Sequence, residues 1–162
     1  MTIIPSNDPI PEGFSYRQGK KEDAGSIIEL VHTVLIEYGL IPEPNGVDKD
    51  LADVETSYNN GYFGVIKENE KIVATYGLFH LDDHAVEIRK MYAAIGARGK
   101  GLGKWMVNHL IQIARHNGYK IIELETASAL KEAIRLYEKM GFQEKDFENK
   151  TPRCDKSFYM NI

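Results

Sequence analysis

Cysteine, excess basic charge and long apolar segments are all scarce in this sequence, and each shortage excludes a class of protein. The single cysteine, Cys154, cannot form an internal disulfide, so we expect a cytoplasmic protein in a reducing compartment. The formal net charge is −4, which argues against the basic surface of a nucleic-acid-binding protein. No segment approaches the roughly 18 apolar residues of a membrane span, and residues 1–11 lack the basic start and apolar length of a signal peptide. We therefore expect neither a nucleic-acid nor a membrane partner.

The histidines do not have the spacing of a metal site. His80 and His84 bracket two aspartates, and His109 and His116 lie seven residues apart. Neither pair has the Cys/His spacing of a zinc site or forms part of a His-Glu-x-x-His sequence. We predict no metal site.

The size and composition of the chain indicate one domain with its own core. It has 162 residues, of which 43% are apolar. Residues 1–13 hold three of the six prolines and are otherwise largely polar, which predicts a flexible N-terminal arm that does not pack. Residues 14–162 are predicted to form the single domain.

Apolar periodicity predicts an α/β fold with a mixed six- or seven-stranded sheet flanked by about four helices. Three strands with short links, over residues 62–67, 71–79 and 85–93, indicate an antiparallel meander. A helix over 102–117 between the third of these strands and a strand over 120–126 indicates a right-handed parallel crossover. Further helices are predicted over 21–39, 48–58 and 130–140, and two short strands over 142–145 and 156–161.

A glycine-rich loop lies where the third strand of the meander ends and the long helix begins. Between Arg89 and Lys104 the chain has five basic residues and no acid. Glycines there let backbone N–H groups converge on an anion, and the helix N-terminus adds partial positive charge. The spacing fits neither the Walker pattern nor the dinucleotide-binding Gly-x-Gly-x-x-Gly pattern. We therefore predict a phosphate cradle of another type.

The cradle and a second motif resemble those of the GNAT N-acetyltransferase superfamily. Residues 98–103, Arg-Gly-Lys-Gly-Leu-Gly, resemble the Arg/Gln-x-x-Gly-x-Gly/Ala sequence with which that family binds the pyrophosphate of acetyl-CoA. Residues 133–142 resemble its Leu-Tyr-x-x-x-Gly-Phe signature, and residues 87–92 resemble its fourth strand. The resemblance implies a GNAT-like fold and acetyl-CoA as co-substrate. It also implies that backbone groups of Met91, Tyr92 and Ala93 pair with the pantetheine arm. The implied cradle consists of Arg98, Gly99, Lys100, Gly101, Leu102, Gly103 and Lys104.

Two positions depart from the family pattern. Ile95 stands where many members have proline, and Leu130 stands where an asparagine often begins the last helix. Ser128 is a candidate replacement for the pantetheine contact of that asparagine. It is equally a candidate N-cap of the last helix.

Acetyl transfer to an amine needs a proton acceptor, donors to the developing oxyanion and a proton for the leaving thiolate. The resemblance assigns the thiolate proton to Tyr137, on the inward face of the last helix. Glu87 lies in a mostly apolar strand, where burial would raise its pKa and make it a plausible base, or else it is a structural partner of Arg89 or Lys90. Glu125 is the second candidate base and Glu123 the third.

The leading hypothesis is an acetyl-CoA-dependent N-acetyltransferase in which a primary amine attacks directly in a ternary complex. The alternative is a non-catalytic acyl-CoA-binding module. The expected partner is a small-molecule or peptide amine, and a homodimer stays open. Carboxylates on the acceptor side would suit a cationic amine, whereas Arg153 would suit one that carries an acid. Cys154 is expected to be a partly buried thiol near the acceptor pocket. The unplaced candidates on that side are Glu37, Tyr38, Glu55, Tyr58, Arg153 and Asp155.

Overall fold

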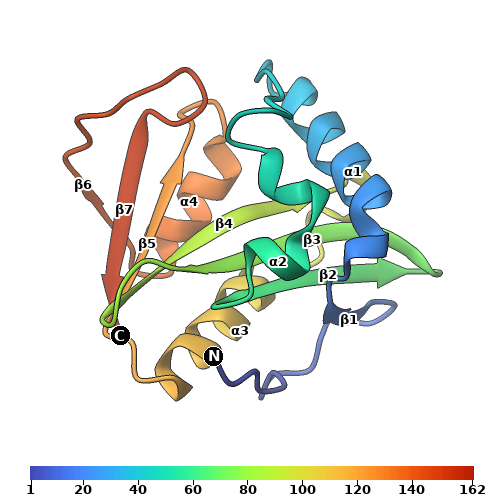
Figure 1. Cartoon of the computed structure of the whole chain (residues 1–162), viewed down its shortest axis with the longest axis horizontal. Helices are drawn as coiled ribbons and strands as arrows, with labels where there is room; N and C mark the ends of the chain where they lie inside the picture. Colours follow the sequence, from blue (N-terminus) through green and yellow to red (C-terminus); the bar gives the residue numbers. More distant parts are fainter.

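The computed structural model describes all residues from 1 to 162 and contains a seven-stranded mixed sheet with four α-helices (Figure 1). The strand order is β1-β2-β3-β4-β5-β7-β6. The α/β fold predicted from the sequence is therefore confirmed. The strands are β1 (Ser15–Gln18), β2 (Tyr62–Glu68), β3 (Lys71–His80), β4 (Ala85–Ala93), β5 (Ile121–Thr126), β6 (Gln143–Lys145) and β7 (Lys156–Asn161). The helices are α1 (Ala24–Glu37), α2 (Val54–Ser57), α3 (Leu102–His116) and α4 (Lys131–Lys139).

The strand directions match the predicted topology. Strands β2, β3 and β4 form the antiparallel meander, and β4 pairs with β5 in parallel after the α3 crossover. Strands β5, β7 and β6 are antiparallel neighbours at the far edge. The seventh strand, β1, pairs antiparallel with β2. The sequence pattern does not locate β1, because it has only four residues and none is buried.

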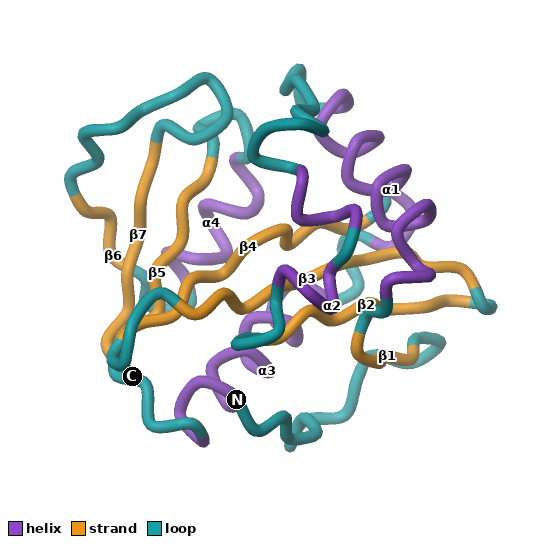
Figure 2. The backbone as a smooth tube through the Cα atoms, in the orientation of Figure 1, coloured by secondary structure: helices purple, strands orange, loops and turns teal.

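The helices cover the two faces of the sheet and make two cores (Figures 1 and 2). Helix α3 buries Met106, Leu110 and Ile113 in a core of 23 buried residues, against which one side of α4 also packs. Helix α1 buries Ile27 and Val31 in a second core of 11 buried residues on the opposite face. These spacings of three and four residues are the reason each helix has a buried stripe. No helix is long and apolar enough to cross a membrane.

Residues 48–58 form two short turns instead of the single helix predicted. A 3₁₀ helix at Lys49–Ala52 is followed by α2, and Asp53 between them has non-helical backbone, with φ −154° and ψ 86°. The Asp53 side chain accepts a hydrogen bond from the Thr56 N–H at 3.1 Å, which favours a new helix start there. Leu51 and Val54 are buried, as predicted.

The N-terminal segment packs against α3, so the predicted absence of packing was wrong. Its prolines do exclude helix and strand from residues 1–13. However, Ile3, Ile4 and Ile10 contact the larger core. The indole N–H of Trp105 donates to the Asp8 carbonyl at 3.0 Å. Apolar residues between the prolines therefore anchor a segment whose composition alone predicts a loose arm.

A gap opens between β4 and β5 because the two strands pair over only four residues of each. Pairing runs from Ala85 with Ile121 to Ile88 with Leu124 and then stops. Beyond it, β4 contains an irregularity opposite β3, where Lys90 has a positive φ of 54°. In Figure 1, β5 rises steeply while β4 runs away from it, with α4 beside the gap. The backbone of β4 past Ile88 is thus unpaired on the side facing β5.

Candidate active site

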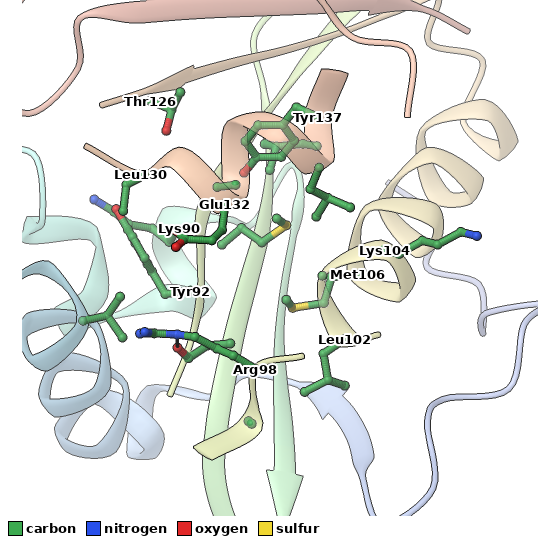
Figure 3. A pocket seen from close by; sticks show the side chains of 18 of the residues that line it. Lys90, Tyr92, Arg98, Leu102, Lys104, Met106, Thr126, Leu130, Glu132 and Tyr137 are labelled. Carbon is green, nitrogen blue, oxygen red and sulfur yellow. Dashed lines mark hydrogen bonds between the residues drawn. The ribbon is translucent and has the colours of Figure 1, made fainter. Parts of the chain in front are cut away.

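A cavity of about 460 Å³ occupies the region where β4 and β5 separate (Figure 3). Its wall is mostly apolar and comes from α1, β4, β5, α3, α4 and the glycine-rich loop. Nine of the ten residues predicted to hold the cofactor line it, Lys100 being the exception. The predicted lining residues are Met91, Tyr92, Ala93, Arg98, Gly99, Gly101, Leu102, Gly103 and Lys104.

Backbone conformation shapes the cradle at one end of the cavity. Gly99 and Gly101 have positive φ values of 72° and 84°, which other residues rarely adopt. Gly101 is the N-cap of α3, so the next N–H groups have no partner within the helix. The first turn of this 15-residue helix contains no acid. A phosphate group therefore fits the cradle electrostatically.

The last glycine of the motif lies at a close contact between α3 and α4. A Cβ on Gly103 would lie 2.8 Å from Cδ2 of Leu136, inside contact distance. The small residue lets the first turn of α3 approach α4, which holds the catalytic candidate Tyr137 near the cradle. The motif thus has a packing role as well as a conformational one.

The long side chains of the cradle do not all reach the cavity. Arg98 donates to the Ala93 carbonyl at 2.9 Å and to the Glu37 carboxylate at 2.8 Å, so it braces the loop against β4 and α1. Figure 3 shows Lys104 extending away from the cavity. Leu102 is buried in the core beneath the cradle. The cradle therefore offers mainly backbone groups.

Tyr137 lies in the cavity wall with its hydroxyl directed toward the interior (Figure 3). Its ring is 4% exposed and packs against Phe142 and Phe158. Burial, and secondarily the nearby Tyr92 hydroxyl, raise the pKa of Tyr137 above its ordinary value. The group therefore keeps its proton at neutral pH and can donate it.

Glu87 is buried beside the site and does not line the cavity. Its carboxylate accepts a hydrogen bond from Nε of Arg89, so it has the structural partner that the sequence suggested. Burial raises the pKa of Glu87, Arg89 opposes this, and the charge of Glu125 adds to it. Its role as a base stays a prediction. Among the other candidates, Glu125 lines the cavity, whereas Glu123 pairs with Lys145 at 2.8 Å outside it.

Residues 30–142, more than half of the chain, match the family model described as the acetyltransferase (GNAT) family. The chain belongs to the GNAT family. The Escherichia coli K12 protein described as uncharacterized N-acetyltransferase YjgM is 33% identical over 151 residues, covering 87% of this chain and 89% of that protein. The family assignment makes the chain an acetyl-CoA-dependent N-acetyltransferase, as the motifs indicate, and it favours an enzyme over a binding module.

Solved GNAT structures share the fold. An acetyltransferase of this family from Staphylococcus aureus Mu50 superposes with a TM-score of 0.83 at 22% identity, covering 91% of this chain and 98% of that chain. The putative acetyltransferase YncA from Salmonella typhimurium, solved with its cofactor acetyl-CoA, superposes with a TM-score of 0.70 at 22% identity, covering 93% and 94%. The seven-stranded sheet with the gap between β4 and β5 is thus a GNAT fold.

Behind the cavity of this GNAT chain is an ionic cluster that the sequence does not reveal. Asp48 is 3% exposed and accepts hydrogen bonds from Arg153 at 2.8 and 3.0 Å and from Lys90 at 2.7 Å. Asp50 lies 3.4 Å from Lys90. The cluster joins a loop, the irregular part of β4 and the segment before β7. These residues are 42 and 105 positions apart, so no local motif signals the cluster.

We predict that Asp48→Asn lowers the free energy of unfolding by about 3 kcal/mol at pH 7. The change leaves two buried cations without their main counter-charge. Arg153 and Lys90 hold the pKa of Asp48 well below its usual range, although burial opposes them. The stabilisation is therefore complete above the unfolded pKa of about 3.9 and is lost as the pH falls further.

Urea unfolding of both proteins at pH 7 and pH 3 measures this effect. The difference between them should shrink at the lower pH. Glu43→Gln is the matched control, because Glu43 is exposed and 3.8 Å from Arg153, and it should cost less than about 1 kcal/mol. Equal stability of Asp48→Asn and the wild type at pH 7 would contradict a stabilising role.

The acceptor-side candidates divide between the cavity wall and other contacts. Tyr38 lines the cavity and donates to the Glu132 carboxylate at 3.3 Å. Tyr58 is buried and donates to Asp50 at 2.6 Å. Glu55 accepts from the Lys21 N–H at 2.7 Å and lies outside the cavity wall.

Ser128, between β5 and α4, has neither of the two roles considered from the sequence, a pantetheine contact or the N-cap of the last helix. Its hydroxyl donates to Asp155 at 2.7 Å, it does not line the cavity, and the N-cap of α4 is Leu130. Leu130 itself lines the cavity. Cys154 is half-buried, and burial with the nearby charge of Glu125 raises its thiol pKa to about 11. No group of three or more His, Cys, Asp or Glu side chains is arranged to hold a metal.

Proposed function

We propose that the chain transfers the acetyl group of acetyl-CoA to a primary amine of a small-molecule or peptide acceptor, by direct attack in a ternary complex. One observation supports this most directly. A single cavity joins the glycine cradle to Tyr137 and to a further stretch of wall that contains Glu125. Both substrates can therefore occupy the site together, as direct attack requires.

The residues of the cavity fit acetyl-CoA. The N–H groups at the start of α3 suit its pyrophosphate, and residues 91–93 of β4, which do not pair with β5, suit the amides of its pantetheine arm. YncA, which was solved with acetyl-CoA, has the same fold. When bound, acetyl-CoA supplies an activated thioester carbonyl.

The remaining chemistry falls to groups of this chain. Backbone N–H groups near Met91 and Tyr92 stabilise negative charge that develops on the carbonyl oxygen. Tyr137, protonated because of its burial, provides the proton for the departing thiolate. Glu87 accepts the amine proton through water, with Glu125 as the alternative because it lines the cavity.

Acetyl-CoA at about 100 times its dissociation constant should stabilise the protein by roughly 2.7 kcal/mol. Gly101→Glu should abolish the stabilisation, since it places a carboxylate at an anion site. Thermal unfolding with and without acetyl-CoA measures both effects.

The control is Gly118→Glu, at the other end of α3. Gly118 has a φ of 83° with open space around it, so the substitution strains the backbone as Gly101→Glu does but leaves the cradle intact. It should retain the acetyl-CoA shift. An equal shift in both variants would place the cofactor elsewhere.

A further inference from the structure

We propose that the acceptor is a cationic amine, one that has a second positive charge and no carboxylate, with an alkyl diamine as the simplest case. The inference rests on the proposed function, because it names the substrate class for the same cavity. It follows from how the charged groups around the cavity are paired.

Most cations of the cavity wall are already paired with acids of this chain. Lys90 donates to Asp48 at 2.7 Å and to the Val47 carbonyl at 2.6 Å. Arg98 pairs with Glu37 at 2.8 Å. The third cation, Lys104, belongs to the cradle at the far end. Lys90 and Arg98 are therefore already occupied, and Lys104 lies among the residues assigned to the pyrophosphate.

Two arginines next to the cavity wall are also paired with carboxylates of this chain. Arg153 has a 9% exposed side chain and forms two hydrogen bonds to Asp48 and one to the Ile41 carbonyl. Arg89 pairs with Glu87 and lies 3.8 Å from the centre of the Phe79 ring. An acceptor with an acid group would have to displace a buried, bidentate partner of Arg153, which is unfavourable.

The acids of the wall, in contrast, have no cationic partner. Glu125 and Glu132 both line the cavity, and neither forms an ion pair. Glu132 accepts only the hydrogen bond from Tyr38. The ring of Tyr92 in the same wall adds aromatic surface that favours a cation, whereas the Tyr38 ring already has the Arg98 guanidinium 5.4 Å from its centre. The wall therefore attracts a positive group and repels a carboxylate.

Three four-carbon amines test this directly: 1,4-diaminobutane, butylamine and 4-aminobutyrate. Each offers an aliphatic primary amine, and they differ in the charge at the other end. The release of CoA thiol from acetyl-CoA gives kcat/KM for each. We expect the order in which they are named, with at least about tenfold between the diamine and the amino acid. Salt at 1 M should reduce this spread, since it screens exposed charges.

Substitution of Glu125 and Glu132 tests whether their carboxylates cause the preference for the diamine. Relative to butylamine, Glu132→Gln should lower kcat/KM for the diamine and raise it for 4-aminobutyrate. Glu125→Gln should also lower the ratio of kcat/KM for the diamine to kcat/KM for 4-aminobutyrate. If Glu125 also acts as the base, all three rates fall by a common factor that cancels from the ratio. Glu138→Gln, on the exposed side of α4, is the control and should keep the wild-type ratio.

Failure of this inference is distinguishable from failure of the proposed function. Equal kcat/KM values, or a preference for 4-aminobutyrate, would overturn the inference while leaving acetyl transfer intact. Absence of thiol release with every amine would contradict acetyl transfer to these acceptors. Calorimetric binding of the three amines to the CoA-loaded protein still ranks them in that case, and any order other than the expected one overturns the inference.

Discussion

Replacing Tyr137 by phenylalanine is expected to lower kcat about 10²- to 10⁴-fold while leaving the affinity for acetyl-CoA nearly unchanged. A proton given to the departing thiolate matters only in the transition state, so its loss does not weaken ground-state binding. The ring keeps its packing against Phe142 and Phe158, since only the hydroxyl is removed. Single-turnover rates and the acetyl-CoA dissociation constant measure the two quantities.

The pH profile adds a second readout for Tyr137. Because burial raises its pKa, the wild type should not lose activity through this group until well above pH 10. Tyr159→Phe is the control, since that hydroxyl bonds only to Gln143. An unchanged single-turnover rate in Tyr137→Phe would remove it from the mechanism.

Glu87→Gln is the second change with a large expected effect, a loss of about 10² to 10⁴ in rate at neutral pH. The pKa of Glu87 is raised chiefly by burial, so activity should fall as the pH drops through that raised value. In the variant, this fall in activity at acidic pH should be absent from the pH profile. The pH profiles measured with one low-pKa and one high-pKa amine separate the titration of the enzyme from the titration of the acceptor amine.

Glu125→Gln is the informative comparison for the base. Its carboxylate lines the cavity, whereas Glu87 is bound to Arg89. If Glu87→Gln gives profiles that superimpose on the wild type for both amines, Glu87 is structural. A large loss in Glu125→Gln would then identify Glu125 as the base.

Much of the fold could be predicted because its signals are local. The strands at Tyr62–Glu68, Lys71–His80 and Ala85–Ala93 have short links and strong apolar character, and the prediction agrees with their bounds to within one residue. The two failures have different causes. A tertiary contact to Trp105 holds residues 1–13, whereas in residues 48–58 the Asp53 side chain caps a new helix at the Thr56 N–H, a local effect that the apolar spacing does not report.

The candidate site also has parts that the sequence predicts and parts that it does not. The cradle is predictable because conformation, glycine pattern and helix start lie within seven consecutive residues. The direction of Lys100 is not, since a loop pattern does not report where a side chain points. The cluster of Asp48, Lys90 and Arg153 is not predictable either, because its members meet only after the sheet has formed.

The gap between β4 and β5 has a consequence for how such an enzyme can diverge. The proposed cofactor end is built mainly from main-chain groups, so it constrains backbone conformation at Gly99 and Gly101 far more than it constrains side-chain chemistry. The proposed acceptor wall is built from side chains such as Glu125 and Glu132, which line the cavity. Substitutions there can change the charge that the wall presents without disturbing the cradle. A single scaffold can therefore acquire a new acceptor while it keeps the same acyl donor.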